Sequence, residues 1–456
     1  MSRRGSWWLA WAVFLPIAAL RAGTLAESDT FWEVRTGLFI WARHRIPATD
    51  PFSWTVAGRP WSLNSWGFDV LAGAAYRVAG LPAVALGCAG LLLAGVAVTL
   101  LLARRLGAAA PVAAAVLLAT MPLLLGWLSA RPQLVDFVLL PSYVLLLRAP
   151  VSRGRLGAAA ASVALLTVVW ANLHAAALVA LAAVLATAGV HTVWRRPAEL
   201  RRALVLAAVT AVCLLANPRG AALVTQAVAV RHASTGTVEE WQHLDPTDVS
   251  QVLMLLLGLV ALPLAWRRRE AALVGPLAIL LAGSLTAVRF LPLLTLLAVP
   301  VLAAALSAPP VLGYLRSRAV VLVPGAALLV ATLVVLAAPA TTHLGRPEPG
   351  TYPSRVQDAV PRGCRVWNSY LLGGWLMLER PDVTVSLDSR NDLYGARQVR
   401  EADRLVAGRG DPGTALAGAG CVLVPSGSGL AGRLEADPSW RRAAGEPVAT
   451  LFVRAR

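Results

Sequence analysis

The feature that most constrains this chain is a series of apolar runs, each long enough to cross a bilayer as a helix. The chain is 57% hydrophobic with a mean hydropathy of +0.65, which is too apolar for a soluble protein of 456 residues. The first run carries Arg21 and is followed by many others, so it is not a cleaved signal peptide. We therefore predict an α-helical polytopic membrane protein with about 11 transmembrane helices, near residues 7–25, 81–103, 109–128, 131–147, 156–171, 174–193, 201–216, 250–266, 271–288, 290–307 and 319–338.

The arginines set the predicted orientation. The net charge of +17 would suggest nucleic acid in a soluble protein, but here the basic residues fall in short loops between spans, so we expect no nucleic-acid partner. With 11 spans, every dense cluster lies on one side, which the positive-inside rule makes the cytoplasm. These clusters are Arg3-Arg4, Arg104-Arg105, Arg148 to Arg155, Arg195 to Arg202, Arg267 to Arg269 and Arg316 to Arg318. We expect a bacterial inner-membrane protein with a cytoplasmic N-terminus.

The composition changes after the last span. From about residue 346 the chain is rich in Gly, Pro, Arg and Asp, and we divide it into a transmembrane domain (1–345) and a small extracytoplasmic α/β domain (346–456). Short strands are predicted at 365–368, 383–387 and 421–424, with helices near 353–360 and 396–407. Cys364 and Cys421 can pair if this domain faces an oxidising compartment.

The loop after the first span, 26–80, is dense in acidic and Trp residues. Glu27, Asp29 and Glu33 stand close together in a chain that is only 14% charged. Residues 29–44 and 66–78 are amphipathic at helical spacing, the second leading into the next span. The acidic residues suit a site beside the membrane, although they also suit the solvated start of a helix, where acidic side chains are favourable.

Isolated polar residues stand at the other span ends on the same predicted face. They include Arg131, Asn172, His174 and Arg289, together with the 217–249 loop, which contains Glu240. Ionisable residues at such places are functional candidates, although headgroup contacts or satisfied boundary positions would also explain them. We found no metal-binding Cys or His spacing, no Walker loop and no Gly-x-Ser-x-Gly.

These residues resemble the bacterial GT-C-type membrane glycosyltransferases, in which an acidic motif follows the first span, as Glu27-Ser28-Asp29 does here. The sequence is most similar to an uncharacterised branch with a C-terminal extracytoplasmic domain. The matching segments are 29–37 (DTFWEVRTG), 47–53 (PATDPFS), 58–61 (GRPW), Arg131-Pro132-Gln133, Asn172-Leu173-His174, 217–220 (NPRG), Glu240-Trp241, Gly373-Gly374-Trp375 and 387–390 (LDSR). The chain departs from the branch at Glu33, where His is common.

The resemblance implies transfer of a sugar from a polyprenyl-phosphate carrier, with inversion, to a glycan, lipid or protein on the extracytoplasmic face. Asp29 would be the general base and Glu27 its partner; both would hold Mn²⁺ or Mg²⁺ if a metal is used. Arginines would offset charge on the leaving phosphate. The implied substrate-binding residues are Arg131, Gln133, Asn172, His174, Arg289, Glu240, Trp32 and Arg35. Membrane lipids are the other expected partners.

Three alternatives remain open at this point. A carrier or flippase for lipid-linked glycans would bind without turnover, and it should have polar residues deep within many spans. A glycan polymerase or ligase would need outer-face Arg and His residues but not the Glu27–Asp29 pair. A structural protein would bind its partner through the C-terminal domain. The sequence does not name the sugar, the acceptor or the oligomeric state.

Overall fold

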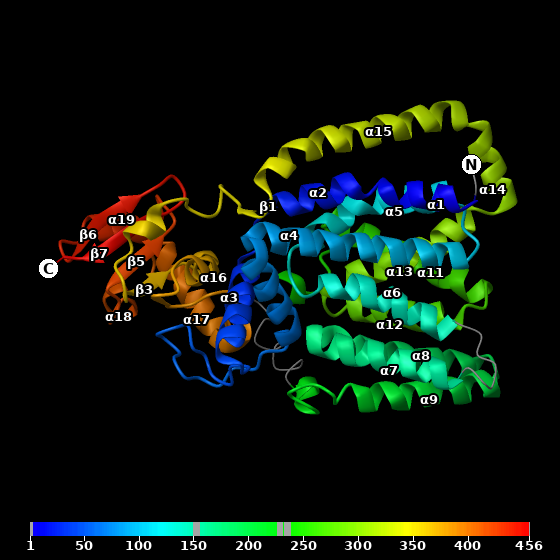
Figure 1. The fold of residues 1–456 in the computed structure, drawn as a ribbon, viewed down its shortest axis with the longest axis horizontal. Helices are drawn as coiled ribbons and strands as arrows, with labels where there is room; N and C mark the ends of the chain where they lie inside the picture. Colours follow the sequence, from blue (N-terminus) through cyan, green and yellow to red (C-terminus); the bar gives the residue numbers. More distant parts are fainter. Residues whose placement is uncertain (1–2, 149–155, 226–230, 232–238, 456) are drawn as a thin grey trace. The chain divides into compact units, whose positions relative to one another are not determined.

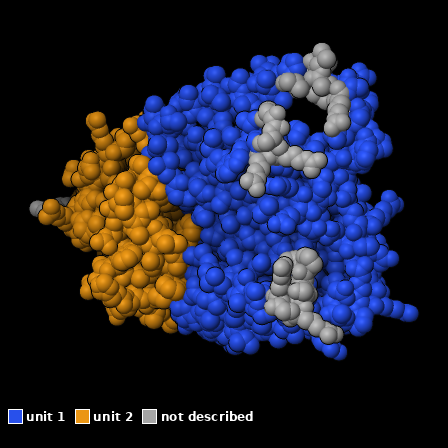
Figure 2. All heavy atoms as spheres, turned by 45° about the vertical axis from the view of Figure 1, so that its right-hand side comes forward, with its two compact units in different colours: residues 1–23, 85–224, 239–344 blue, residues 24–84, 225–238, 345–456 orange. Residues whose placement is uncertain are grey.

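The computed structural model describes residues 3–148, 156–225, 231 and 239–455. Parts of the predicted 148–155 arginine cluster and of the 217–249 loop lie outside them. The chain forms two compact units, coloured separately in Figure 2. Unit 1 comprises residues 1–23, 85–224 and 239–344, and unit 2 comprises 24–84, 225–238 and 345–456. Each unit is described by itself.

Unit 1 is a bundle of apolar helices. Helix α13 forms its core, because 78% of the apolar window around this helix is buried, against 6% for α15. Helices α12 and α8, α8 and α9, and α7 and α9 pack side by side (Figure 1). In chain order the helices are α1 (Arg3–Ala12), α2 (Leu15–Gly23), α5 (Ala110–Leu124), α6 (Leu134–Arg148), α7 (Leu156–Leu173), α8 (Leu178–Val193), α9 (Pro197–Cys213), α11 (Val249–Arg267), α12 (Ala271–Ser284), α13 (Leu291–Leu306), α14 (Pro309–Ser317) and α15 (Ala319–Ala340).

Small residues allow these helices to approach closely, as is common where there is little hydrophobic driving force between spans. A Cβ atom on Gly275 of α12 would lie 2.5 Å from the backbone nitrogen of Thr187 in α8. A Cβ atom on Gly258 of α11 would lie 2.6 Å from the side chain of Leu294 in α13. Substitution of Gly275 would push two helices apart, whereas substitution of Gly258 would require the Leu294 side chain to move.

The chain is a polytopic membrane protein. Among the described residues, eight helices are long and apolar enough to cross a membrane. Three predicted spans coincide with shorter helices: α6 has 15 residues, α9 has 17 and α12 has 14. Short 3-10 turns, η3 (Ala175–Ala177) and η5 (Val288–Phe290), directly precede α8 and α13 and extend those apolar segments to Ala175–Val193 and Val288–Leu306.

Helix α4 (Trp66–Arg105) starts in unit 2 and ends in unit 1. It is interrupted at Ala79 and Gly80, where Gly80 has a φ of 66°, a left-handed value that favours glycine. This break confirms the predicted change from an amphipathic segment, 66–78, to a span beginning near residue 81.

Unit 2 combines the first loop with the C-terminal segment. Its five-stranded sheet has the order β4-β3-β5-β7-β6, with β3 parallel to β4 and β5 and the β5–β7 and β7–β6 pairs antiparallel. A short parallel pair, β1–β2, lies outside this sheet. The elements are β1 (Thr24–Leu25), α3 (Ser28–Arg43), β2 (Arg346–Pro347), η7 (Val356–Ala359), β3 (Arg365–Asn368), α16 (Tyr370–Glu379), β4 (Thr384–Val385), α17 (Asn391–Val406), α18 (Pro412–Ala415), β5 (Cys421–Val424), α19 (Gly429–Glu435), β6 (Trp440–Gly445) and β7 (Thr450–Arg454).

The predictions for this segment are partly confirmed. Strands β3 and β5 have the predicted bounds, and a disulfide joins Cys364 to Cys421 beside them. The predicted strand at 383–387 is only two residues long, and the predicted helix at 353–360 is a short 3-10 turn. Pro353 and Pro361 flank that turn, and a proline restricts the preceding residue to extended conformations, which shortens the helix.

Candidate functional site

The candidate acidic pair stands at the start of α3. Glu27 is the N-cap residue with extended backbone angles, and Asp29 lies in the first helical turn. Acidic side chains are favourable there because the first N–H groups of a helix have no helical acceptor. Trp32, one turn further along α3, donates a hydrogen bond of 3.1 Å from its indole to Oδ1 of Asp29. This bond fixes one oxygen of the Asp29 carboxylate.

Two tyrosines from the C-terminal segment, Tyr352, which is buried, and Tyr370, which is half-buried, adjoin this pair. The Tyr352 hydroxyl donates a hydrogen bond of 2.9 Å to the Ala26 carbonyl. Burial, followed by the charges of Glu27 and Asp29, raises the pKa of Tyr352. Burial and the charge of Asp29 likewise raise the pKa of Tyr370, whose hydroxyl accepts a hydrogen bond of 2.7 Å from Asn391. Both phenols therefore stay neutral beside the carboxylates. Sequence reasoning missed them, since no motif marks a tyrosine more than 300 residues away.

The glycines of the Gly373-Gly374-Trp375 motif bring α16 against its neighbours. A Cβ atom on Gly374 would lie 2.5 Å from the Ser28 carbonyl oxygen, and one on Gly373 would lie 2.0 Å from the Leu387 carbonyl oxygen. Trp375 is buried and stacks on Tyr352, with ring centroids 6.2 Å apart. Packing thus explains the Gly373-Gly374-Trp375 motif that this chain shares with the family it resembles. The motif allows α16 of the C-terminal segment to lie against the start of α3.

A buried ionic network also ties the first loop to the C-terminal segment within unit 2. Arg390 donates to Asp388 through Nε at 2.8 Å and Nη2 at 2.6 Å, and to Asp50 through Nη1 at 2.8 Å. All three side chains are 0% exposed. The Arg390 guanidinium also lies over the Trp61 ring, 4.6 Å from its centroid. Asp388 and Arg390 of the 387–390 segment therefore form an internal ion pair, and Asp50 is a second partner of Arg390 that the sequence did not reveal.

The other two candidates of unit 2 lie on α3. Trp32 packs edge to face with Trp61, with centroids 6.0 Å apart. The Arg35 guanidinium lies over the Phe52 ring, 5.5 Å from its centroid. Both side chains are half-buried, and Trp32 contacts Asp29 directly through the hydrogen bond described above.

The remaining candidates belong to unit 1, where Asp136 organises a polar cluster that sequence reasoning did not identify. Asp136 lies in the first turn of α6 and is buried. Its two oxygens are engaged by Nε1 of Trp170 at 2.7 Å and by Nδ1 of His174 at 2.8 Å. A carboxylate in this position fixes the orientation of the imidazole and leaves Nε2 for another partner.

Arginines and a glutamate complete this cluster. Arg131 forms an ion pair with Glu240, and its Nε donates to Ser129 at 3.0 Å. The Gln133 amide oxygen, when turned toward Arg131, accepts from Nε at 2.8 Å. Burial raises the pKa of Glu240, but the charges of Arg131 and Arg289 outweigh it and hold that pKa below its ordinary value. Glu240 is therefore ionised and serves as a counter-ion to two cations.

Arg289 and Asn172 differ in their surroundings. The Arg289 guanidinium lies 4.1 Å from the centroid of the Trp241 ring and lines a small cavity of about 40 Å³ that Asp136, Gln133 and Glu240 share. The Asn172 amide instead donates to the carbonyls of Val168, in its own helix, and of Ala216, both at 2.8 Å, and the second bond ties the end of α7 to the segment after α9. The predicted residues thus form two clusters: Glu27, Asp29, Trp32 and Arg35 in unit 2, and Arg131, Gln133, His174, Glu240 and Arg289, with Asn172 nearby in the chain, in unit 1.

The residues present limit how a metal would be held. Within the described part of the chain, no group of three or more His, Cys, Asp and Glu side chains is placed to hold an ion. Mg²⁺ often takes only one or two carboxylates and completes its shell with water and substrate phosphate. Glu27 and Asp29 fit that shared arrangement and do not form an all-protein cage.

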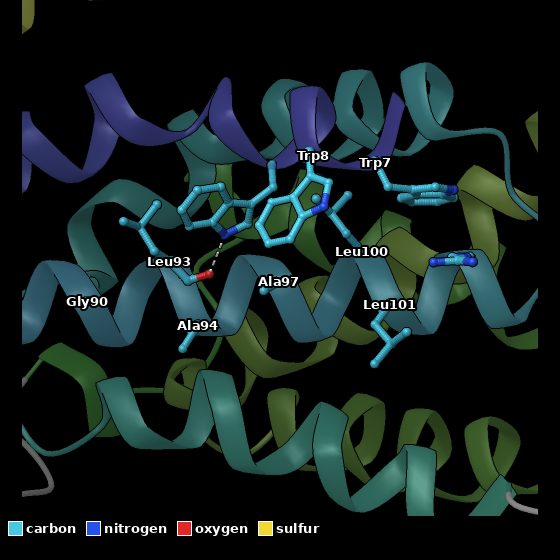
Figure 3. A pocket seen from close by; sticks show the side chains of 10 residues that line it. Trp7, Trp8, Gly90, Leu93, Ala94, Ala97, Leu100 and Leu101 are labelled. Carbon is cyan, nitrogen blue, oxygen red and sulfur yellow. Dashed lines mark hydrogen bonds between the residues drawn. The ribbon is translucent and has the colours of Figure 1, made fainter. Parts of the chain in front are cut away.

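A lateral groove of about 600 Å³ runs along α1 and α4 (Figure 3). Trp11 donates a hydrogen bond of 3.0 Å to the Leu93 carbonyl there. The lining is apolar except for one arginine: Trp7, Trp8, Trp11, Leu93, Ala97 and Arg104 are among its residues. The groove suits a hydrocarbon chain and offers no group for proton transfer.

Comparisons with known proteins define the fold. No family model and no curated protein matches the sequence. Solved structures do match: the apo oligosaccharyltransferase of Archaeoglobus fulgidus has a TM-score of 0.59 at 11% identity, covering 93% of this chain and 69% of that one. The archaeal oligosaccharyltransferase AglB from the same organism, in complex with an inhibitory peptide and a dolichol-phosphate, has a TM-score of 0.62 at 12% identity, with the same coverage of 93% and 69%.

A bacterial structure matches over the whole chain. Apo ArnT from Cupriavidus metallidurans has a TM-score of 0.59 at 14% identity, covering 100% of this chain and 99% of that one. The chain therefore has the GT-C fold of membrane glycosyltransferases, and the expectation drawn from the sequence resemblance is confirmed at the level of fold. At these identities the match carries the fold alone.

Proposed function

We propose that this chain is a membrane glycosyltransferase that moves a sugar from a polyprenyl-phosphate carrier to a glycan, lipid or protein acceptor. The observation that carries the proposal is the Glu27–Asp29 pair at the start of α3, directly after the first span of a GT-C fold. We assign the active-site face to the extracytoplasmic side of a bacterial inner membrane from the distribution of arginines in the sequence. The acceptor classes are those that the sequence resemblance implies.

The reaction is a displacement at the anomeric carbon. The acceptor hydroxyl oxygen forms a bond to that carbon, the carbon–oxygen bond to phosphate breaks, and the polyprenyl phosphate leaves with the bonding electrons. We assign Asp29 to take the hydroxyl proton, with Glu27 beside it, since a positioned carboxylate is a suitable general base. A single displacement of this kind inverts the anomeric configuration.

The neutral phenol of Tyr370 suits a hydrogen-bond donor to the acceptor, because its hydroxyl oxygen accepts from Asn391 and its proton is left for another partner. The Tyr352 hydroxyl already donates to the Ala26 carbonyl, so it can only accept. Both phenols are neutral, and neither adds a negative charge beside the base. Trp32 offers the aromatic face on which a sugar ring can stack.

Phosphate binding is assigned to Arg131 and Arg289, with His174 held by Asp136. A guanidinium fork matches phosphate oxygens, and Glu240 keeps the two arginines compensated until an anion arrives. The solved complex of AglB contains a dolichol-phosphate, which is a lipid phosphate of the same chemical kind. This supports a lipid-phosphate donor for the present chain.

The test is transfer by the purified full chain in lipid. Radiolabelled polyprenyl-phosphate sugars are supplied with bacterial envelope extract as acceptor, in the presence of Mg²⁺, Mn²⁺ or a chelator. We expect turnover in the wild type and a loss of about 10²- to 10⁴-fold for Asp29→Asn. The matched control is Glu401→Gln, which removes an exposed carboxylate of the same unit. Binding of every donor without release of polyprenyl phosphate would refute the enzyme and favour the carrier alternative.

A further inference from the structure

A polar cavity at the arginine-rich ends of the unit 1 helices is separate from both clusters described above. It measures about 380 Å³ and lies between the end of α6, the end of α8, the start of α9 and the α11–α12 turn. Four arginines line it against two glutamates: Arg148, Arg196, Arg202, Arg269, Glu199 and Glu270.

One of these arginines is already neutralised. Arg148 forms a two-pronged ion pair with Glu270, with Nε–Oε2 and Nη2–Oε1 distances of 2.7 Å each. Glu199 is then the one other acidic residue among the lining residues to oppose Arg196, Arg202 and Arg269. The cavity therefore carries a net positive charge, which an anion would offset.

The turns around the cavity hold these cations in place. Arg196 and Arg269 both lie over the Trp194 ring, each 5.2 Å from its centroid, although they come from different inter-helix turns. Arg269 also has a φ of 57°, a left-handed conformation that is costly for a residue with a side chain. Strain of this kind persists where the surrounding structure enforces it, and it is common at binding sites.

Two buried polar atoms add to this picture. Nδ1 of His191, which lines the cavity, has no hydrogen-bond partner among the residues described, and the same is true of Nε1 of Trp194. Buried polar groups are nearly always satisfied, so each exception calls for an explanation. A ligand oxygen in the cavity would supply the partner for His191.

Apart from Thr187, the rest of the lining is apolar. Leu147, Ala203 and Leu206 face the cavity from helices α6 and α9, and Ala271 and Ala272 from the start of α12. A soluble anion would gain nothing from contact with these apolar side chains. A phospholipid, in contrast, places a phosphate beside the start of its apolar acyl chains. Basic pockets between transmembrane helices on the cytoplasmic side are a known form of anionic-lipid site.

We propose that this cavity binds the headgroup phosphate of an anionic phospholipid from the cytoplasmic leaflet, with Arg196, Arg202 and Arg269 as its contacts. The site does not depend on the glycosyltransferase assignment. Its effect would be to hold α8, α9 and α11 together at one end of the bundle, because the lipid would contact arginines from both the α8–α9 and the α11–α12 connections.

The test compares two double variants with the same loss of charge. Arg202→Gln with Arg269→Gln removes two lining cations, whereas Arg201→Gln with Arg267→Gln removes two neighbouring arginines that do not line the cavity. The full chain is reconstituted in nanodiscs of phosphatidylcholine with 20 mol% phosphatidylglycerol, as a probe composition of about one anionic lipid in five. Retained lipid is then counted by native mass spectrometry after detergent extraction.

We expect at least fivefold less retained phosphatidylglycerol for the cavity variant than for the wild type and the control variant. Equal retention in all three would overturn the proposal. A second arm adds inorganic phosphate to lipid-free protein in neutral detergent, where thermal unfolding also shows whether each variant is folded. Stabilisation by inorganic phosphate equal to that by phosphatidylglycerol would assign the site to a free anion and overturn the lipid assignment.

Discussion

Replacement of Arg390 by methionine tests the account of unit 2 most sharply. Arg390 donates three hydrogen bonds to two buried carboxylates, and a fourth, of 3.2 Å, to the Tyr394 hydroxyl. Methionine keeps the apolar stem but leaves Asp50 and Asp388 buried without their cation. Breaking a buried ion pair in this way costs about 3–5 kcal/mol.

The cost translates into a large thermal shift. For a folded unit of this size, each kcal/mol of lost unfolding free energy lowers the thermal unfolding midpoint by about 2–4 °C, so we expect the midpoint to fall by about 6–20 °C. The measurement is thermal unfolding of the full chain in neutral detergent, followed by tryptophan fluorescence. Trp61 is a local reporter, because its ring centroid lies 4.6 Å from the Arg390 guanidinium.

The matched control is Arg397→Met in α17, the helix whose N-cap residue is Arg390. Arg397 is 88% exposed and forms a surface ion pair with Glu401, so its loss should cost less than about 1 kcal/mol. Adding Asp50→Asn and Asp388→Asn to Arg390→Met should recover part of the loss, since no buried charge then remains. A midpoint for Arg390→Met equal to that of Arg397→Met would refute the reasoning.

Three further predictions use the same protein. Gly374→Ala should destabilise unit 2 by about 1–3 kcal/mol in the same unfolding assay, because its Cβ atom would meet the Ser28 carbonyl at 2.5 Å. The control, Gly432→Ala, places its Cβ atom in open space and should not destabilise the unit. Equal unfolding midpoints for the two variants would contradict this prediction. Burial raises the pKa of Glu446, but hydrogen bonds from Ser354 and its neighbours outweigh it and lower that pKa. The stabilisation by Glu446 is thus present above its unfolded-state pKa near 4.5 and is lost as the pH falls through its lower folded-state pKa. Glu446→Gln should therefore flatten the pH dependence of the unfolding midpoint between these two pKa values. An unchanged pH profile of the midpoint would contradict this prediction. Asp136→Asn and His174→Gln should each lower transfer by about 10- to 100-fold, and the double variant by no more than the stronger single one; additive losses would show that the two act separately.

Much of the fold was predictable because its signals are local. Apolar run length and arginine position identify helices, and short runs of strand-favouring apolar residues identify β3 and β5. Of the two missed strands, β7 carries the same signal in Thr450, Phe452 and Val453 and was overlooked. Strand β6 lacks it: β6 reads Trp440-Arg441-Arg442-Ala443-Ala444-Gly445, and its pairing with β7 rather than its own residues makes it a strand.

The candidate site was predictable only in part, for a related reason. Glu27 and Asp29 stand out because charge is rare near the first span. Tyr352, Tyr370 and Asp50 do not stand out, since their importance comes from tertiary contacts across more than 300 residues. Asp136 was hidden inside a predicted span, where its role is visible only once Trp170 and His174 lie beside it.

The central claim is that Asp29 acts as the base in sugar transfer from a lipid phosphate. The most direct measurement is the rate at which the full chain in nanodiscs releases polyprenyl phosphate from a labelled donor when acceptor is present, for the wild type and for Asp29→Asn. The account predicts release that depends on acceptor and falls by about 10²- to 10⁴-fold in the variant, with donor binding retained. Undiminished release by Asp29→Asn would contradict it.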